Sequence, residues 1–226
     1  MFRHRYPVFN DDIQGTGCVI LSGFLNAAKI SSASSGRPLT DHRILFLGAG
    51  SAGVGVGEQL MSFFTLQGMS EAEARSRIWL VDSQGLVYDK RGAMAEHKKL
   101  FARTDYTGPP LTNLVDIIQY VKPTALLGLS TITVCRPVQQ QQFLKVIILF
   151  VLPVQGAFNQ EVIEAMSGIN TRPIIFPLSN PVSLSECTYD EALAWSQGSV
   201  IFASGSPFPQ AMVDGNLRFP GQGNNM

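Results

Sequence analysis

Hydrophobic and polar positions follow two alternating patterns along the chain. Short apolar runs rich in β-branched residues predict buried strands, and they are separated by longer segments with apolar residues at helical spacing. The strand-like runs lie at 43–47 (RILFL), 78–82 (IWLVD), 125–129 (ALLGL), 173–178 (PIIFPL) and 199–203 (SVIFA). The helix-like segments lie at 15–29, 54–67, 71–77, 111–120, 159–167 and 188–197. Strands that alternate with helices form βαβ units, so the order predicts an α/β fold with a doubly wound parallel sheet covered on both faces.

Local signals mark some of the boundaries. Ser70 with Glu73 and Thr188 with Glu191 have the spacing of a capping box, so we expect helices to begin there. Gly36 begins a loop ahead of the first strand, and the run SSASS directly before it indicates a flexible polar joint.

Composition excludes several classes of function. The chain has 226 residues, 45% hydrophobic and 15% charged, enough for one large domain with a real core. Lys plus Arg and Asp plus Glu both number 17, so no basic field favours nucleic acid or an anionic membrane. The three cysteines are odd in number and widely spaced, which is typical of reduced thiols in an intracellular compartment, cytoplasmic or mitochondrial. The apolar stretch 143–154 is too short to span a bilayer.

The segment RILFLGAGSAGVGVGEQL carries the sharpest motif. Gly48, Gly50 and Gly53 form G-x-G-x-x-G between a strand and a helix, the pattern of a dinucleotide site. The first glycine allows a tight turn, the second lets backbone approach a pyrophosphate, and the third lets helix and strand pack closely. Ala49 and Ser51 belong to the same loop, and the helix N-terminus favours phosphate. The alternative is a glycine-rich turn in an α/β domain that binds no ligand.

Asp82 ends the second predicted strand, where a carboxylate accepts hydrogen bonds from the adenosine ribose, with Ser83 beside it. A carboxylate at this place favours NAD, because it repels a 2′-phosphate. Lys98 and Lys99 follow on the next segment and could neutralise that phosphate, or they could form a solvated surface. The choice between NAD and NADP therefore stays open.

Two further clusters have candidate chemistry. Asp11 and Asp12 lie in YPVFNDDIQGTG before a helix, and adjacent carboxylates in an apolar stretch suit a divalent cation or an N-cap with a surface acid. Asn180 follows a strand in PLSNPVS, and Asn224 and Asn225 follow glycines in FPGQGNN. Their amides could donate to a substrate carboxylate, or they could be ordinary turn asparagines.

Taken together, these motifs resemble the malic enzyme family, most closely its fungal members. The segments VFNDDIQGT, FLGAGSAG, IWLVDSQGL, VKPTALLGLS, RPIIFPLSNP, SECTYDEAL, IFASGSPF and PGQGNN occur in the family in this order. The resemblance implies a Rossmann-like NAD(P)-binding domain and the oxidative decarboxylation of malate to pyruvate and CO₂. It also implies NAD or NADP, Mg²⁺ or Mn²⁺, and a full-length protein that is a homo-oligomer.

The resemblance also assigns roles to residues. Asp12 becomes a metal ligand with Asp11 in support, and Asn180, Asn224 and Asn225 bind the substrate. The cofactor residues are Gly48, Ala49, Gly50, Ser51, Gly53, Asp82, Ser83 and Lys99. The catalytic tyrosine and lysine, the substrate arginine and two further metal ligands of the family lie upstream of VFNDDIQGT. We therefore expect residues 1–226 to be an NAD(P)-binding fragment with little activity alone. The rivals are a non-catalytic nucleotide-binding fragment and another Rossmann dehydrogenase acting on amino or hydroxy acids.

Residues 134–155 (VCRPVQQQQFLKVIILFVLPVQ) fit neither period, and joining Thr133 to Gly156 restores the strand, turn and helix order of the family. Introns begin with GT and end with AG. Every valine codon begins with GT and one glutamine codon is CAG, so an intron translated in frame would begin with valine and could end with glutamine, as Val134 and Gln155 do. We interpret the segment as an insertion, from a retained intron or an erroneous gene model. The rival is a genuine hydrophobic loop. An insertion should add no strand to the main sheet.

Overall fold

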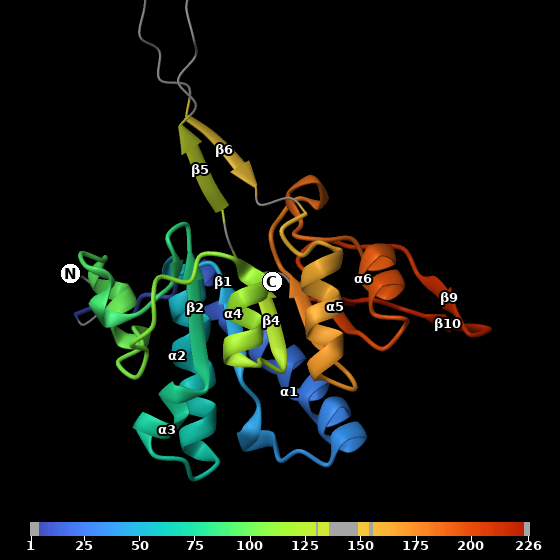
Figure 1. The fold of residues 1–226 in the computed structure, drawn as a ribbon, viewed down its shortest axis with the longest axis horizontal. Helices are drawn as coiled ribbons and strands as arrows, with labels where there is room; N and C mark the ends of the chain where they lie inside the picture. Colours follow the sequence, from blue (N-terminus) through green and yellow to red (C-terminus); the bar gives the residue numbers. More distant parts are fainter. Residues whose placement is uncertain (1–4, 130, 136–148, 154–155, 224–226) are drawn as a thin grey trace, which may run out of the picture.

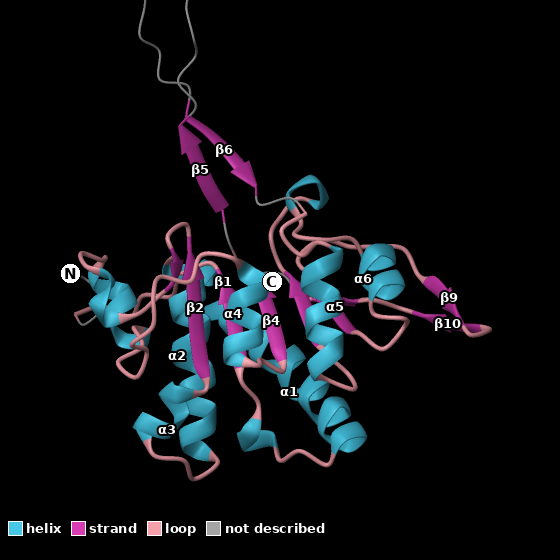
Figure 2. Cartoon of the chain, in the orientation of Figure 1, coloured by secondary structure: helices cyan, strands magenta, loops and turns pink. Residues whose placement is uncertain are grey.

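The computed structural model describes residues 5–129, 131–135, 149–153 and 156–223. Its centre is a seven-stranded sheet in the order β11-β8-β7-β4-β1-β2-β3 (Figures 1 and 2). The strands of this sheet are β1 Ile44–Leu47, β2 Ile78–Asp82, β3 Gly85–Leu86, β4 Ala125–Gly128, β7 Ile174–Pro177, β8 Ile201–Ser204 and β11 Gly221–Gln222. All neighbours pair in parallel except β3, which is antiparallel to β2.

The sheet is doubly wound around β1. Ile44 of β1 is in register with Ile78 of β2 on one side and with Ala125 of β4 on the other. The chain therefore runs outward from β1 to β2 and then crosses back to β4, which makes a topological switch point beside β1. All five predicted strands are present, and β1 is internal as the α/β prediction requires.

Helices cover both faces of the sheet. They are α1 Thr16–Ser35, α2 Ser51–Leu66, α3 Glu71–Ser76, α4 Leu114–Val121, α5 Gln160–Ile169 and α6 Tyr189–Trp195. Ile44 and Phe46 of β1 pack with α1 and α2, whereas Leu45 of the same strand packs with α4, α5 and α6. Alternate strand residues thus enter two separate cores.

Short helical turns connect these elements. They are the π-helix η1 Asp11–Gly15 and the 3₁₀ turns η2 Leu39–Asp41, η3 Asp89–Arg91, η4 Glu96–Phe101 and η5 Val182–Leu184. Both predicted capping boxes are confirmed, because Ser70 caps α3 with Glu73 and Thr188 caps α6 with Glu191.

The serine run before Gly36 was wrongly predicted to be a flexible joint. It forms the last turns of α1, which continues to Ser35. Serine hydroxyls donate back to the helix, from Ser35 to the Ser31 carbonyl at 2.8 Å, and Ser31 donates to the carbonyl of Arg172 at 3.0 Å. Gly36 ends the helix in the left-handed conformation with φ 71°. Tertiary contacts such as the bond from Ser31 to Arg172 therefore outweigh the modest helix propensity of serine.

Other boundaries also differ from the prediction. Helix α2 begins at Ser51 rather than 54, and α4 begins after Asn113, whose side chain caps the helix by accepting from Val115 and Asp116. The hairpin of β9 (Ala211–Val213) and β10 (Asn216–Arg218) was missed. Its turn is Asp-Gly with positive φ at both residues, which is a strong hairpin signal even though the flanking strands are too short to show a buried apolar run.

The remaining strands, β5 Thr131–Cys135 and β6 Leu149–Pro153, form a separate antiparallel pair. Figure 1 shows this pair projecting from the carboxyl edge of the main sheet. The described residues of 134–155 therefore add no strand to the main sheet, as expected of an insertion, although the pairing begins three residues earlier, at Thr131. Most of the segment, 136–148 and 154–155, lies outside the described residues. In the described ranges no helix has the length and apolar character needed to cross a membrane.

Candidate functional site

The glycine motif connects β1 to α2 at the carboxyl edge of the sheet. Gly48 adopts φ 128°, and its N–H donates to the Val81 carbonyl of β2 at 2.8 Å. A Cβ on Gly53 would lie 2.3 Å from the Gly48 carbonyl oxygen, so only glycine fits there. A Cβ on Gly50 would meet no atom within 4 Å. Gly50 thus borders open space in front of the helix, where a pyrophosphate needs close access to backbone.

The first turn of α2 can receive an anion. Gly50 is the N-cap, and it provides no side-chain cap. The helix has 16 residues and no acidic residue in its first turn, so no carboxylate competes for its N-terminal N–H groups. Ser51 is exposed and Ala49 is buried. The loop therefore has the shape and the partial positive charge that a phosphate requires.

Asp82 lies at the end of β2, next to this loop in the sheet, and it is held by two cations. Arg91 donates to both carboxylate oxygens, at 2.9 and 2.5 Å, and Lys98 Nζ lies 2.6 Å from Oδ2. The N–H of Gln84 donates to Oδ1 at 2.9 Å. The side chains of Asp82 and Arg91 are 10% and 6% exposed. This carboxylate therefore belongs to a nearly buried cluster that carries one more positive than negative charge.

The cluster changes the acidity of Asp82. Burial opposes ionisation, but the hydrogen bonds from Arg91 and Lys98 outweigh burial and lower its pKa to about 2. Lys99, which the resemblance assigned to the cofactor, instead pairs with Glu96 at 2.6 Å on the surface. Ser83 follows Asp82 on an exposed turn. The neighbouring lysine, not Lys99, is the one that reaches the carboxylate.

Turn η4 brings a second group to the glycine loop. His97 Nε2 lies 3.2 Å from the Ala49 carbonyl oxygen. Because a carbonyl only accepts, the proton of a neutral His97 is on Nε2. Sequence reasoning missed His97 and Arg91, since each contact depends on how a turn of the chain folds back over the sheet. The only sequence signal was the cluster of basic residues between positions 90 and 99.

The candidate substrate end lies beyond β7 and β8. Asn180 accepts a hydrogen bond at Oδ1 from the hydroxyl of Ser206 at 2.9 Å. Gly205 permits this approach, because a Cβ there would lie 2.8 Å from Asn180 Oδ1. The preceding residue, Ser179, donates its hydroxyl to the buried carboxylate of Glu186 at 2.5 Å. Asn180 is therefore fixed at the carboxyl edge of the sheet, whereas Asn224 and Asn225 lie outside the described residues.

The acidic pair lies in η1, before α1. Asp11 is half-buried and its Oδ1 lies against Gly15, where a Cβ would be only 2.0 Å away. The side chain of Asp12 lies outside the described part. Within that part no three His, Cys, Asp or Glu residues come together as metal ligands. The described residues therefore do not form a divalent-metal site by themselves.

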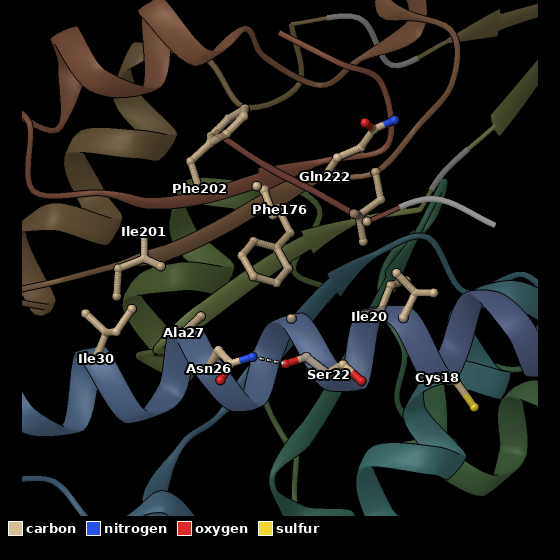
Figure 3. Close-up of a pocket in the computed structure, with 16 residues that line it drawn as sticks. Cys18, Ile20, Ser22, Asn26, Ala27, Ile30, Phe176, Ile201, Phe202 and Gln222 are labelled. Atoms are coloured by element: carbon tan, nitrogen blue, oxygen red, sulfur yellow. Dashed lines mark hydrogen bonds between the residues drawn. The ribbon is translucent and has the colours of Figure 1, made fainter. Parts of the chain in front are cut away.

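A separate apolar groove of about 640 Å³ runs between α1 and the strands β7, β8 and β11 at one end of the sheet. Figure 3 shows Ile20, Ala27 and Ile30 of α1 on one side and Ile201 and Phe202 on the other. Its only polar side chains are short or uncharged. The groove therefore lacks the charged groups that distinguish the glycine-loop site.

Comparison with known proteins assigns the family. The family described as "Malic enzyme, NAD binding domain" matches residues 13–136 and 141–226. The chain belongs to the malic enzyme family. Within that family it is 46% identical over 226 residues to the NADP-dependent malic enzyme of Dictyostelium discoideum. It is 40% identical to the NADP-dependent malic enzyme of Rattus norvegicus over 225 residues, and 39% identical to the mitochondrial NAD-dependent malic enzyme of Ascaris suum over 224 residues.

The match covers nearly all of this chain but a minor part of each relative. It spans 100% of the chain and 37% of the Dictyostelium enzyme, 99% and 34% for the rat enzyme, and 99% and 30% for the Ascaris enzyme. Solved malic enzymes share the fold. The Thermotoga maritima enzyme gives a TM-score of 0.60 at 20% identity, covering 99% of this chain and 46% of its own. The Entamoeba histolytica enzyme gives 0.59 at 23%, covering 88% and 33%. The Rossmann-like NAD-binding fold is thus confirmed.

Proposed function

We propose that this chain is the NAD(P)-binding domain for the oxidative decarboxylation of malate to pyruvate and CO₂. In that reaction the hydroxyl proton of malate leaves, and a hydride passes from C2 to the nicotinamide ring. The bond between C3 and its carboxylate then breaks to release CO₂, and C3 takes up a proton. The observation that carries the proposal is the β1–α2 glycine loop with open space before Gly50, within a family named for this activity.

We propose that the adenosine end accepts either dinucleotide. We propose that Gly48, Ala49, Gly50, Ser51 and Gly53 receive the pyrophosphate. Asp82 faces the ribose with its charge already neutralised, so its repulsion of a 2′-phosphate is weakened. The excess positive charge of Arg91 and Lys98 supports NADP. We therefore propose that NADP binds at least as tightly as NAD, with Lys98 rather than Lys99 nearest the 2′-phosphate.

We propose that Asn180, Asn224 and Asn225 bind the substrate carboxylates. Asn180 is supported by its fixed place beside Ser206 at the sheet edge, where open α/β sheets bind ligands. Asp12, with Asp11 beside it, is proposed as a ligand of Mg²⁺ or Mn²⁺ in the full-length enzyme. The described residues do not form that site by themselves, and the family's further metal ligands lie upstream of VFNDDIQGT. For the whole protein, we propose a homo-oligomer in a mitochondrial or cytoplasmic compartment.

Calorimetric titration of this chain with NAD, NADP and ADP-ribose tests the nucleotide site. We expect measurable binding of all three, with NADP at least equal to NAD. Lys98→Ala should weaken NADP more than NAD, whereas Lys99→Ala, the matched control on the same turn, should leave their ratio unchanged. The absence of any nucleotide binding to the folded chain would refute the proposed function.

A second assay separates the malic enzyme reaction from nucleotide binding alone. Malate-dependent formation of NAD(P)H should be far lower for residues 1–226 than for a full-length relative, because the chain spans about a third of the relatives' length. Activity comparable with the full-length enzyme would show that the upstream family residues are dispensable. A chain that binds nucleotide but never supports malate oxidation, even within a full-length protein, would favour the rival non-catalytic domain.

A further inference from the structure

Turn η4 is fixed beside the glycine loop by two contacts with other elements. At its end, the buried ring of Phe101 packs against α2 at Gly57, where a Cβ would lie 3.0 Å from Phe101 Cε2. At its centre, Lys98 Nζ lies 2.6 Å from Oδ2 of Asp82, the last residue of β2. The turn is thus attached both to the helix that follows the glycine loop and to the neighbouring strand.

His97 precedes Lys98 in this turn and contacts the glycine loop itself. Its Nε2 lies 3.2 Å from the carbonyl oxygen of Ala49, and it is the donor because a carbonyl only accepts. In the described part of the chain, no other side chain forms a hydrogen bond with the backbone of residues 48–53. His97 is exposed whereas Ala49 is buried, so a surface side chain holds the central peptide of the loop.

This contact also sets the direction of the next N–H group. Ala49 and Gly50 are joined by a trans peptide, in which the carbonyl and the N–H lie in one plane and point in opposite directions. Because the Ala49 carbonyl points to His97, the Gly50 N–H points away from η4. Among the described residues this N–H has no hydrogen-bond acceptor, and Gly50 is exposed with no atom within 4 Å of its Cβ position. The Gly50 N–H is therefore accessible to a ligand.

Resting on the proposed NAD(P) site, we propose that His97 is a positioning residue for the pyrophosphate of the cofactor. By donating to the Ala49 carbonyl, it keeps the Gly50 N–H directed at the phosphate oxygens, together with the free N–H groups in the first turn of α2. Without this bond the peptide can rotate, since its rotation changes φ of Gly50 and glycine accepts either sign of φ. A rotated peptide would present a carbonyl oxygen, which repels a phosphate.

Two adjacent residues of η4 then serve different parts of the cofactor. His97 acts on the pyrophosphate, which NAD and NADP share, whereas Lys98 lies at Asp82, where the 2′-phosphate distinguishes the two cofactors. Loss of the His97 bond should therefore weaken both dinucleotides alike and leave the ratio of their affinities unchanged. This expectation separates His97 from a residue that contacts the 2′-phosphate.

Calorimetric titration of three variants with NAD, NADP and ADP-ribose tests the role. His97→Leu removes the donor and should weaken all three ligands about three- to tenfold, as expected for one lost hydrogen bond. His97→Gln keeps an N–H donor and should bind close to the parent. Glu96→Gln, the matched control, changes an exposed side chain of the same turn and should bind as the parent does. Because His97 is exposed, the thermal midpoint of each variant should stay near the parent value.

The Gly50 amide provides a second readout, and it needs no variant. ADP-ribose has the pyrophosphate but neither nicotinamide nor 2′-phosphate. When it is added to the isotope-labelled parent chain, the Gly50 N–H resonance should move downfield as this group bonds to a phosphate oxygen. The movement at saturation should be smaller in His97→Leu and should return in His97→Gln. A residue that only stabilises the fold would not produce this pattern.

Each outcome decides between the role and the site. If ADP-ribose binds to the parent but the Gly50 resonance does not move, the role of His97 is refuted and the nucleotide site stands. The same conclusion follows if His97→Leu binds as tightly as the parent, or if His97→Gln binds as weakly as His97→Leu. A larger loss for NADP than for NAD would show that His97 contacts the 2′-phosphate, which also overturns the role. If no nucleotide binds, the proposed function and this inference both fall.

Discussion

The glycines of the 48–53 loop differ in what an added side chain would meet. At Gly50 a Cβ would face open space, whereas at Gly53 it would lie 2.3 Å from the Gly48 carbonyl oxygen. Gly50→Val should therefore keep the fold and thermal midpoint but weaken NAD(P) binding at least about tenfold, because the side chain occupies the space for the pyrophosphate. Gly53→Ala should destabilise the domain by about 1–3 kcal/mol. Calorimetry and urea unfolding measure the two effects. Gly50→Val binding as tightly as the parent would contradict the phosphate role.

His42 predicts how stability depends on pH. It is buried between Ser32 and Thr124, and burial, followed by the nearby charge of Arg37, lowers its pKa to about 4. An unfolded histidine titrates near 6.5, so the unfolded chain binds more protons between these values. The contribution of neutral His42 to the free energy of unfolding is therefore complete above pH 6.5 and is lost as the pH falls toward 4. At pH 5 the loss amounts to about 2 kcal/mol. Urea unfolding at pH 7 and pH 5 should show this loss. His42→Gln should show a smaller pH dependence, and an equal loss in both chains would contradict it.

Sequence could predict the glycines but not the partners of the charged residues. The G-x-G-x-x-G spacing indicates positions where the local backbone conformation and close packing require glycine, and these needs arise within a few residues of sequence. Asp82 was placed correctly at a strand end, but its bond to Lys98 rather than Lys99 depends on the rotation of η4 against the sheet. Glu186 was missed for a similar reason, since the space that it fills is left by a glycine far away in sequence, at position 128.

At the scale of elements, the C-terminus of α1 shows how tertiary contacts override propensity. Gly36 ends the helix with φ 71°, a conformation that costs an alanine about 1 kcal/mol although no atom lies within 4 Å of its Cβ position. Gly36→Ala should lower the free energy of unfolding by about that amount. Gly168→Ala, within α5 and equally unobstructed, should raise it by about 0.5–1 kcal/mol. Thermal and urea unfolding of both variants test the pair, and stabilisation by Gly36→Ala would contradict the left-handed cap.

The periodicity found the central strands and helices because each buries a face whose apolar residues recur at the period of that element. Short elements escaped it. β3, β11 and the hairpin of β9 and β10 have too few residues for a period, and they form where the turn chemistry or an existing strand edge provides partners. The serines at the end of α1 were wrongly predicted to form a flexible joint, because the sequence does not show that their hydroxyls donate to carbonyls within the helix and beyond it.

At the scale of the whole molecule, the order of the elements predicted the doubly wound sheet, because βαβ units leave few topologies open. What it could not predict is how the chain accommodates residues 134–155. The described residues of the segment belong to β5 and β6, which pair only with each other, from Thr131 with Pro153 to Cys135 with Leu149, and the pair is separate from the main sheet. The pair of β5 and β6 therefore projects from the carboxyl edge of the sheet, after β4 in the chain.

Deleting residues 134–155, so that Thr133 joins Gly156, tests whether the segment is an insertion. Loop-closure entropy hardly opposes a longer connection, since each doubling of length costs about 0.6 kcal/mol. The larger penalty comes from the run FLKVIILFVLPV, which has strong β-propensity and one charge, a composition typical of aggregation-prone segments. The deletion should raise solubility and the thermal midpoint together and should leave nucleotide affinity intact or improved. A loss of more than about 2 kcal/mol in the free energy of unfolding, as expected for lost core packing, would instead show that the segment belongs to the fold.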